Sequence, residues 1–260
     1  MTEVNTEHYT FKSSSGTELR ARLITPATNS NHMTSLVFMM TGDGPKGSKS
    51  LSWVSMPGML AERGISSFVF DFEGLGYSEG RRQDLTIGKS VADGMSALRI
   101  AKSIESIDSS RIGVFGASFG GTIALLIASR DSTIKSLGLK SPVSDYCRAL
   151  YYEFGDAEIS AWKAIGHSTR VGFDYGFFED AKAIDVYREC QQIQCPVLIT
   201  HGSADAVVPL TQSQHLLSTL TKATSKHLEV FDAVGHGYNE NGAWEKMANM
   251  FVQWFQSTLS

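Results

Sequence analysis

The sequence predicts an α/β fold, a mostly parallel, doubly wound sheet, as a single domain over residues 1–260. Short apolar runs typical of buried strands alternate with amphipathic, helix-like segments along most of the chain. Residues 111–129 read RIGVFGASFGGTIALLIAS, a strand, a glycine turn and a helix in succession. No repeat or low-complexity linker divides the chain, and 260 residues are enough to bury one large core.

The first strands form an edge hairpin and two buried strands in this prediction. Residues 7–12 and 17–25 alternate polar and apolar side chains around a Ser-Ser-Gly turn, which indicates a β-hairpin. A polar loop is expected at 28–31. Residues 36–40, LVFMM, and 65–71, ISSFVFD, have the continuous apolar character of strands that are covered on both faces.

Two helices separate these strands from the centre of the sheet. The first is expected at 51–63 and ends near a glycine, and the second spans 84–105 with apolar residues at helical spacing. Between them, a loop with three glycines ends in Arg81 and Arg82. This arginine pair could hold an anionic substrate, although such a pair more often is solvated or lies near a helix start.

The second half of the chain resumes the alternation after an unusual insert. A strand is expected at 134–139, and further strands at 195–202 and 227–232. Helices are expected at 210–220 and, as the closing amphipathic element, at 243–258. The same alternation places these strands in the parallel part of the sheet.

Residues 143–190 break this rhythm and hold a large share of the aromatic side chains. We interpret this insert as a lid, with Tyr152, Trp162 and Phe177 as candidate substrate-binding residues. The alternative is that these rings only pack the insert against the body of the protein.

Composition limits the classes of partner. The net charge of −4 gives no basic surface for nucleic acid, and no apolar run approaches the roughly 20 residues of a membrane span. The start, MTEVNTEHYTF, lacks the pattern of a signal peptide, and the three scattered cysteines fit reduced thiols, so a cytoplasmic location is expected. No Cys/His cluster has metal-ligand spacing, and no metal is expected. Either a monomer or a homodimer is compatible with the sequence.

The segment GASFGG at residues 116–121 points to a nucleophile. Between a strand and a helix, a G-x-S-x-G turn holds its serine in a strained conformation with the hydroxyl clear of the sheet. The helix start also directs free N–H groups toward whatever Ser118 attacks. A plain glycine-rich turn is the alternative, and the flanking strand and helix favour the nucleophile.

A second glycine turn, beginning Thr41-Gly42-Asp43, follows the strand at 36–40. We expect the backbone N–H groups of Asp43 and Phe119 to form an oxyanion hole, the alternative being a plain strand-to-helix turn. A carboxylate directed at the oxyanion would oppose catalysis, so the Asp43 side chain is expected to turn away.

A serine hydroxyl needs a base within hydrogen-bond reach. In this topology the acid and the histidine follow the serine in chain order, each in a loop after a strand. His236 lies between two glycines after the last strand, and Asp205 follows the preceding strand within HGSADAVVP. Asp205 can accept the His236 Nδ1–H, or it can serve only as a turn residue. Asp232 is the less favoured acid because it lies so close to His236 along the chain.

The motifs GASFGG, HGSADAVVP and VGHGY, in that order, resemble the α/β-hydrolase fold family of serine hydrolases, and FVFDFEGLGYSEG resembles that family's loop after its fourth strand. The match covers nearly the whole chain outside residues 143–190. The resemblance implies about eight strands, a small helical lid and no cofactor. The insert resembles the lid of compact carboxylesterases, including cinnamoyl/feruloyl esterases. One departure is the oxyanion turn, which usually begins His-Gly in the family and here begins Thr41-Gly42.

We therefore expect hydrolysis of carboxylic esters that carry small-to-medium apolar or aromatic acyl groups, through an acyl-enzyme on Ser118. An acyl-thioesterase or a small serine peptidase could use the same residues, since the lid and loops select the leaving group. A binding protein on the same scaffold is a third hypothesis, because fold does not fix function.

Overall fold

The protein is described by a computed structural model that covers residues 3–27, 33–240 and 242–260. The polar loop expected at 28–31 lies outside these residues.

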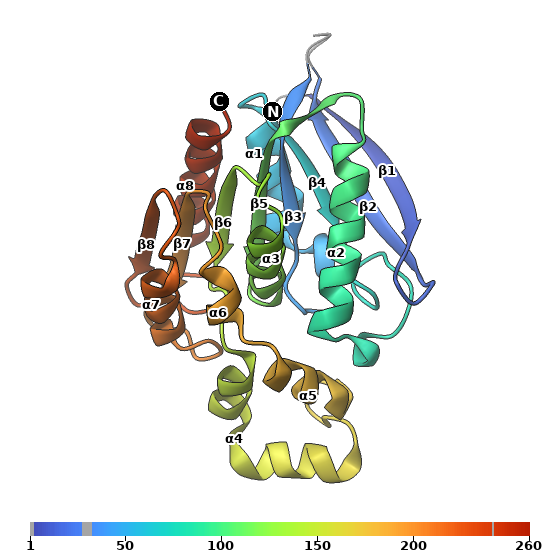
Figure 1. Ribbon diagram of the computed structural model, residues 1–260, viewed down its shortest axis with the longest axis vertical. Coiled ribbons are helices and arrows are strands. Elements are labelled where there is room, and N and C mark those ends of the chain that lie inside the picture. Colours follow the sequence, from blue (N-terminus) through green and yellow to red (C-terminus); the bar gives the residue numbers. More distant parts are fainter. Residues whose placement is uncertain (1–2, 28–32, 241) are drawn as a thin grey trace.

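Eight strands form one sheet in the order β1-β2-β4-β3-β5-β6-β7-β8 (Figure 1). The first two form the expected antiparallel hairpin, and β2 pairs antiparallel with β4. All pairs from β4 to β8 are parallel, so the sequence-based prediction of the fold class is confirmed. The strands are β1 (Val4–Lys12), β2 (Glu18–Pro26), β3 (Thr34–Met40), β4 (Ser66–Phe70), β5 (Ile107–Ala117), β6 (Ser136–Lys140), β7 (Val197–Gly202) and β8 (Lys226–Phe231).

Helices cover both faces of the sheet. Helices α1 and α8 pack with one hydrophobic cluster, and α2, α3, α6 and α7 contribute to the cluster on the other face. The α-helices are α1 (Leu51–Ala61), α2 (Ile87–Lys102), α3 (Phe119–Arg130), α4 (Tyr146–Ile165), α5 (Tyr175–Ala183), α6 (Val186–Cys190), α7 (Leu210–Thr219) and α8 (Ala243–Thr258). Short 3₁₀ turns occupy Gly47–Lys49 and Arg82–Asp84.

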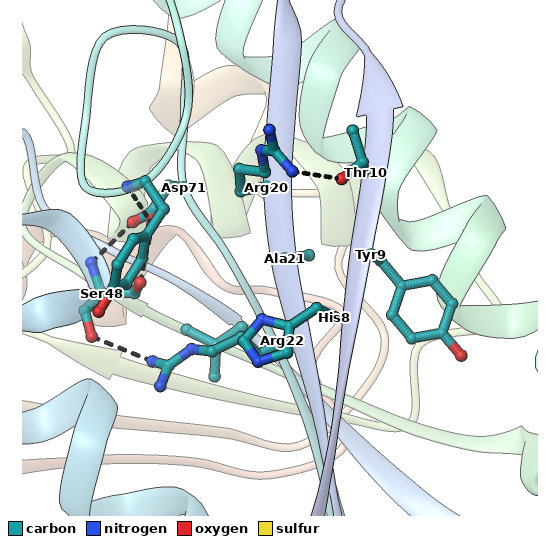
Figure 2. A pocket seen from close by; sticks show the side chains of 10 residues that line it. His8, Tyr9, Thr10, Arg20, Ala21, Arg22, Ser48 and Asp71 are labelled. Carbon is teal, nitrogen blue, oxygen red and sulfur yellow. Dashed lines mark hydrogen bonds between the residues drawn. The ribbon is translucent and has the colours of Figure 1, made fainter.

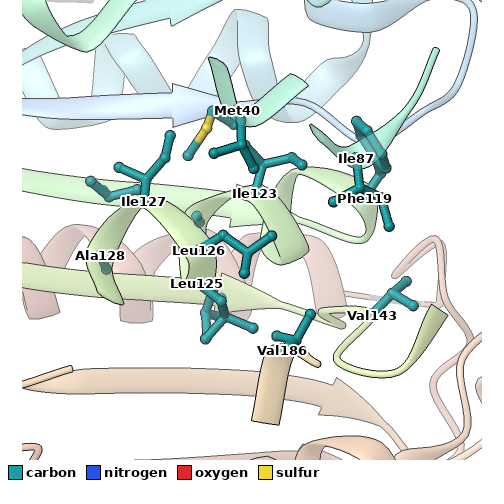
Figure 3. Packing of buried hydrophobic residues seen from close by; sticks show 14 of the residues in the cluster. Met40, Ile87, Phe119, Ile123, Leu125, Leu126, Ile127, Ala128, Val143 and Val186 are labelled. Carbon is teal, nitrogen blue, oxygen red and sulfur yellow. The ribbon is translucent and has the colours of Figure 1, made fainter. Parts of the chain in front are cut away.

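The strand alternation of β3 shows how the two cores are separated. Phe38 and Met40 join the cluster on the α3 side, whereas Val37 and Met39 join the cluster on the α1 and α8 side. Helix α3 lies between sheet and outer helices, and Figure 3 shows its apolar side chains beside Met40. Because α3 is buried along nearly its whole length, the turn that precedes it has a fixed position at the edge of the sheet.

One helix begins later than the sequence predicts. The amphipathic pattern suggested a start at residue 84, but α2 starts at Ile87. Thr86 caps it, since its side-chain oxygen accepts the Lys89 N–H at 3.2 Å. Residues 82–84 form a separate 3₁₀ turn, which turns Arg82 toward the end of the sheet, as its contacts below show.

The segment between β6 and β7 contains α4, α5 and α6. Figure 1 shows α4 and α5 as a layer beyond the end of the sheet. Helix α4 is kinked at Gly155, where φ is 75° and ψ is 169°. The segment is tied to the body by hydrogen bonds, including Gly88 N–H to Asp180 Oδ2 at 2.7 Å.

The packing of α3 on β3 predicts a strong cost for a side chain at Gly120. A Cβ there would collide with the carbonyl oxygens of Met40 and Thr41, which are main-chain atoms that cannot move aside cheaply. We expect Gly120→Ala to lower the free energy of unfolding by about 2 kcal/mol or more, measured by urea denaturation. The matched control is Gly58→Ala in α1, where a Cβ meets nothing within 4 Å and should stabilise the helix slightly. Equal effects of the two substitutions would contradict the close approach.

Candidate active site

Ser118 lies in the turn between β5 and α3, with φ 52° and ψ −115°. This conformation costs energy for a residue with a Cβ, and such strain persists only where the surroundings enforce it. Here the Ser118 N–H donates to the Lys140 carbonyl at 3.0 Å, and the Ser118 carbonyl accepts from Gly121 N–H at 3.0 Å. The main chain is therefore held on both sides of the serine.

His236 and Asp205 are joined directly. The structure places them in the loops after β8 and β7, and His236 Nδ1 lies 2.7 Å from Asp205 Oδ2. Asp232 does not take this place, since it accepts a bond from Ser203 Oγ at 3.2 Å instead. The bond sets the His236 tautomer with its proton on Nδ1, which leaves Nε2 as a free base.

Asp205 is held as an anion by its donors. Burial acts to raise the Asp205 pKa, but hydrogen bonds from His201, His236 and the Val208 N–H outweigh it and hold this pKa far below its usual range. The backbone N–H groups of Val207 and Val208 donate to Oδ1 at 2.9 and 2.8 Å. A permanent carboxylate is the form that stabilises a protonated His236.

His201 is a buried supporting residue that the sequence reading did not single out. Its Nε2 lies 2.9 Å from the Val208 carbonyl and 3.4 Å from Asp205 Oδ2. Its Nδ1 lies 2.7 Å from Ser213 Oγ. The ring thus fixes the loop that carries Asp205, and the signal in the sequence was a histidine at the end of an otherwise apolar strand.

Ser118 and His236 border the same two cavities. Among the hydrogen bonds of the described residues, none joins the Ser118 hydroxyl to His236. Catalytic hydrogen bonds are often long in the absence of substrate and tighten in the complex. The structure therefore brings the two side chains to one site while leaving the hydroxyl free.

The two expected oxyanion donors lie at this site. Phe119 is the first residue of α3, so its N–H has no partner within the helix. Asp43 follows β3 and borders both cavities. Arg82 donates from Nε to the Asp43 carbonyl at 2.7 Å, and its Nη2 lies 3.8 Å from Asp43 Oδ2. Burial raises the Asp43 pKa, and Arg82 opposes this shift.

Arg82 is thus engaged within the protein. Besides Asp43, it donates to the Val171 carbonyl and stacks over the Phe173 ring, with Cζ 4.2 Å from the ring centroid. It connects the loop after β3 to the segment between β6 and β7. Arg81, by contrast, is exposed and paired with Asp84.

The two cavities differ in size and extend in different directions from Ser118. The larger, of about 690 Å³, extends from Ser118 toward α1 and α8 and includes the polar residues Asn239 and Glu240. The smaller, of about 170 Å³, is lined mainly by apolar side chains from α4 and neighbouring loops: Val143, Tyr146, Ala149, Leu150, Phe154, Val171, Phe173, Val207 and Val208. This division suits a substrate that extends in two directions from one reacting carbon.

The three aromatic residues expected to bind substrate do not line either cavity. Tyr152 is 56% exposed, Trp162 is buried within the α4–α5 segment, and Phe177 packs against Phe119. The correction follows from the position of α4, which turns Tyr146 and Phe154 toward Ser118 instead. The sequence shows that the segment is rich in aromatic residues. It does not show which face of each helix points toward Ser118, because that depends on packing between distant segments.

Lys140, the last residue of β6, links both halves of the site and was missed from the sequence. Its carbonyl accepts the Ser118 N–H, and its Nζ donates to the His236 carbonyl at 2.9 Å. Its Nζ also lies 4.5 Å from the centroid of the Tyr238 ring. Burial lowers the pKa of Lys140 to about 8, with Asp205 acting in the opposite direction. The sequence did contain a signal for this role, namely a lysine at the end of a buried parallel strand.

Comparison with known proteins identifies the family of this chain. Residues 51–260 match the Prolyl oligopeptidase family. The chain belongs to this family. An Escherichia coli relative, an uncharacterized 31.7 kDa protein in the traX-finO intergenic region, is 26% identical over 238 residues, which cover 77% of this chain and 83% of the relative.

Solved structures share the fold of this family member. Est1E from Butyrivibrio proteoclasticus, solved with ferulic acid bound, gives a TM-score of 0.77 at 21% identity, covering 95% of this chain and 98% of Est1E. A putative hydrolase from Agrobacterium vitis S4 gives 0.78 at 20% identity, covering 99% and 100%. The family match and the fold make the chain a serine hydrolase of the α/β-hydrolase type, as the motifs predicted.

Two kinds of feature are absent from the described residues. No group of three or more histidine, cysteine or acidic residues within them is arranged to hold a metal ion. No helix in the described part of the chain is long and apolar enough to cross a membrane.

The position of Lys140 predicts a pH dependence. Lys140→Met keeps the side-chain length but removes the charged donor to His236, and we expect about tenfold lower kcat on an ester substrate. In the unsubstituted enzyme, activity should decline as pH rises through about 8, where the ammonium loses its proton. The variant should lack this inflection.

Stability measurements separate this role from folding. Because the folded state lowers the Lys140 pKa below its value of 10.5, folding disfavours the charged form; this cost is complete below about pH 8, decreases as pH rises through 8, and is gone only above about 10.5. Lys140→Met removes this cost and should therefore be at least as stable as the unsubstituted protein at neutral pH. Identical pH–activity profiles for the two proteins would contradict the role of Lys140.

Proposed function

We propose that the protein hydrolyses carboxylic esters by acyl transfer to Ser118. The observation that carries this proposal is the 2.7 Å bond between His236 Nδ1 and Asp205 Oδ2, beside a serine held in a strained turn. These features supply a nucleophile, a base with a defined tautomer and a carboxylate that stabilises the protonated base.

In the proposed reaction, His236 Nε2 takes the Ser118 hydroxyl proton as Ser118 Oγ bonds to the ester carbonyl carbon. The N–H groups of Phe119 and Asp43 stabilise the oxyanion, and each such donor contributes about 3 kcal/mol in comparable sites. His236 then gives its proton to the leaving alcohol as the carbon–oxygen bond breaks. Water, deprotonated by His236, attacks the acyl-enzyme and releases the acid.

The cavities support an assignment of the substrate's two parts. The acyl group, small to medium in size and apolar or aromatic, occupies the smaller apolar cavity, and the alcohol lies in the larger one. Residues 143–190 act as a lid within the single domain of residues 1–260, because α4 supplies much of the acyl wall.

A small serine peptidase is the second candidate, and membership of the Prolyl oligopeptidase family favours it. The same residues would transfer the acyl group from an amide. Turnover of a p-nitrophenyl ester, a thioester and a p-nitroanilide that share one acyl group ranks ester, thioester and amide cleavage. A binding protein on this scaffold would cleave none of the three.

Ser118→Ala should abolish ester hydrolysis, because it removes the atom that bonds to the acyl carbon. We expect kcat/KM for p-nitrophenyl butyrate to fall by about 10³-fold or more. Ser110→Ala, an exposed serine on β5, is the control and should leave the rate unchanged. Undiminished hydrolysis by Ser118→Ala would remove the proposal.

Glu153 predicts discrimination against anionic acyl groups. It borders the acyl cavity, and its pKa is raised by burial and by Asp43, with Arg170 opposing the shift. A succinyl monoester should react at least about tenfold more slowly than the butyryl ester, because a second carboxylate would face Glu153.

Glu153→Gln should narrow this difference by improving turnover of the succinyl ester. The matched control is Glu158→Gln, since Glu158 also lies near Arg170, at 3.8 Å, but is absent from the cavity lining. Faster turnover of the succinyl ester by the unsubstituted protein would count against the assignment of this cavity.

A further inference from the structure

A separate cavity of about 410 Å³ lies at the edge hairpin of the sheet. Figure 2 shows Arg20 and Arg22 from β2, with His8 and Thr10 from β1, beside Ser48 and Asp71. Neither Ser118 nor His236 belongs to its lining. Its volume is in the range of pockets that hold small molecules.

The register of the hairpin concentrates positive charge here. Arg20 and Arg22 are two residues apart on β2, so their side chains share one face of the sheet. Across the hairpin, Thr10 pairs with Arg20 and His8 pairs with Arg22. The two arginines are therefore neighbouring cations on one face, and an anion between them would reduce their mutual repulsion.

Arg22 is fixed in place without a carboxylate partner. Its Nη2 donates to the main-chain carbonyls of Ser48 at 3.1 Å and Trp53 at 3.3 Å. No ion pair within 4 Å joins it to an acid in the described part of the chain. Its Nε is buried and has no acceptor there. Arg22 acts on the Asp71 carboxylate only through space, so its guanidinium keeps N–H groups and charge for a ligand.

The acids nearby are already engaged. Both Asp71 oxygens accept bonds, Oδ1 from Ser48 N–H at 2.7 Å and Oδ2 from Ser48 Oγ at 2.7 Å and Tyr77 N–H at 3.0 Å. Glu18 pairs with Arg20, whose Nη1 also donates to Thr10 Oγ1 at 2.9 Å. Arg20, Arg22 and Lys49, which lies beside Tyr77, therefore carry three positive charges against the two negative charges of Glu18 and Asp71.

Tyr77 supplies a flat wall. It is 54% exposed, with Arg22 Cζ 5.9 Å and Lys49 Nζ 4.4 Å from its ring centroid. A planar ligand lying on this ring would place an attached anionic group among the cations.

We propose that this cavity binds a small organic anion, with its carboxylate or phosphate on Arg20 and Arg22 and its planar body against Tyr77. The site is independent of the esterase reaction, since it shares no residue with the Ser118 cavities.

The test is an NMR titration of protein labelled with ¹³C in its tyrosine rings. Tyr77→Phe and Tyr146→Phe assign one reporter in each cavity. Benzoate or phenyl phosphate should shift the Tyr77 signal saturably at millimolar concentration, and the tighter of the two identifies the anionic group. Benzamide, the neutral analogue, should not. Movement of the Tyr146 signal alone, or no movement at all, would overturn the proposal.

Substitutions test the contacts. Arg20→Gln and Arg22→Gln should each weaken binding about tenfold, because each removes a charged donor. Arg99→Gln on α2 makes the same charge change on the other face of the sheet and should have no effect. The Arg22→Gln variant could misfold, because it loses the contacts of Arg22 to α1. Arg20 is partly exposed, so Arg20→Gln still tests the binding site in that case. Unchanged affinity in Arg20→Gln overturns the arginine contact, and inorganic phosphate binding as tightly as phenyl phosphate overturns the contact with Tyr77.

Discussion

The backbone conformation of Ser118 is the constraint on which the site depends. A positive φ at a non-glycine residue between a buried strand and a buried helix is held there by neighbours on every side. The bond to Lys140 fixes the strand end, and the bonds to the Ser118 carbonyl fix the helix start. Because a Cβ at Gly116 or Gly120 would collide with main chain, the sequence around Ser118 has little freedom to change.

Electrostatics of the site follow from the same topology. Parallel strands end at one edge, so the loops after β5, β6, β7 and β8 meet there without any local sequence signal for the meeting. Asp205 stays ionised because hydrogen-bond donors surround its carboxylate. Burial lowers the pKa of Lys140, and the negative charge of Asp205 offsets only part of this effect. Asp205 places an anion at the His236 ring, and Lys140 places a cation at the His236 carbonyl. These two contacts together fix the position of His236.

The sequence was sufficient for the parts that local pattern determines. Buried strands, the amphipathic helices and the serine turn follow from apolar periodicity and glycine placement, and α8 has the expected bounds. It was insufficient where packing between distant segments decides. The face that α4 presents to Ser118 depends on its kink and on the neighbouring loops, so Tyr146 and Phe154 were not distinguished from Tyr152 and Trp162. Lys140 looked like the end of a strand because its partner, His236, lies 96 residues away.

Family membership and fold similarity define the chain as a serine hydrolase. They do not determine which bond it cleaves, which depends on the residues of the site. The features of this chain that bear on that bond are the two cavities that meet at Ser118 and the carboxylate of Glu153 in the wall of the smaller one.

The most direct test of the central claim is reaction with a fluorophosphonate probe followed by peptide mass mapping. The account predicts one stoichiometric adduct, located on Ser118, that forms much more slowly in His236→Gln. A protein that forms no adduct, or one labelled at the same rate without His236, would contradict the proposal that these side chains act together.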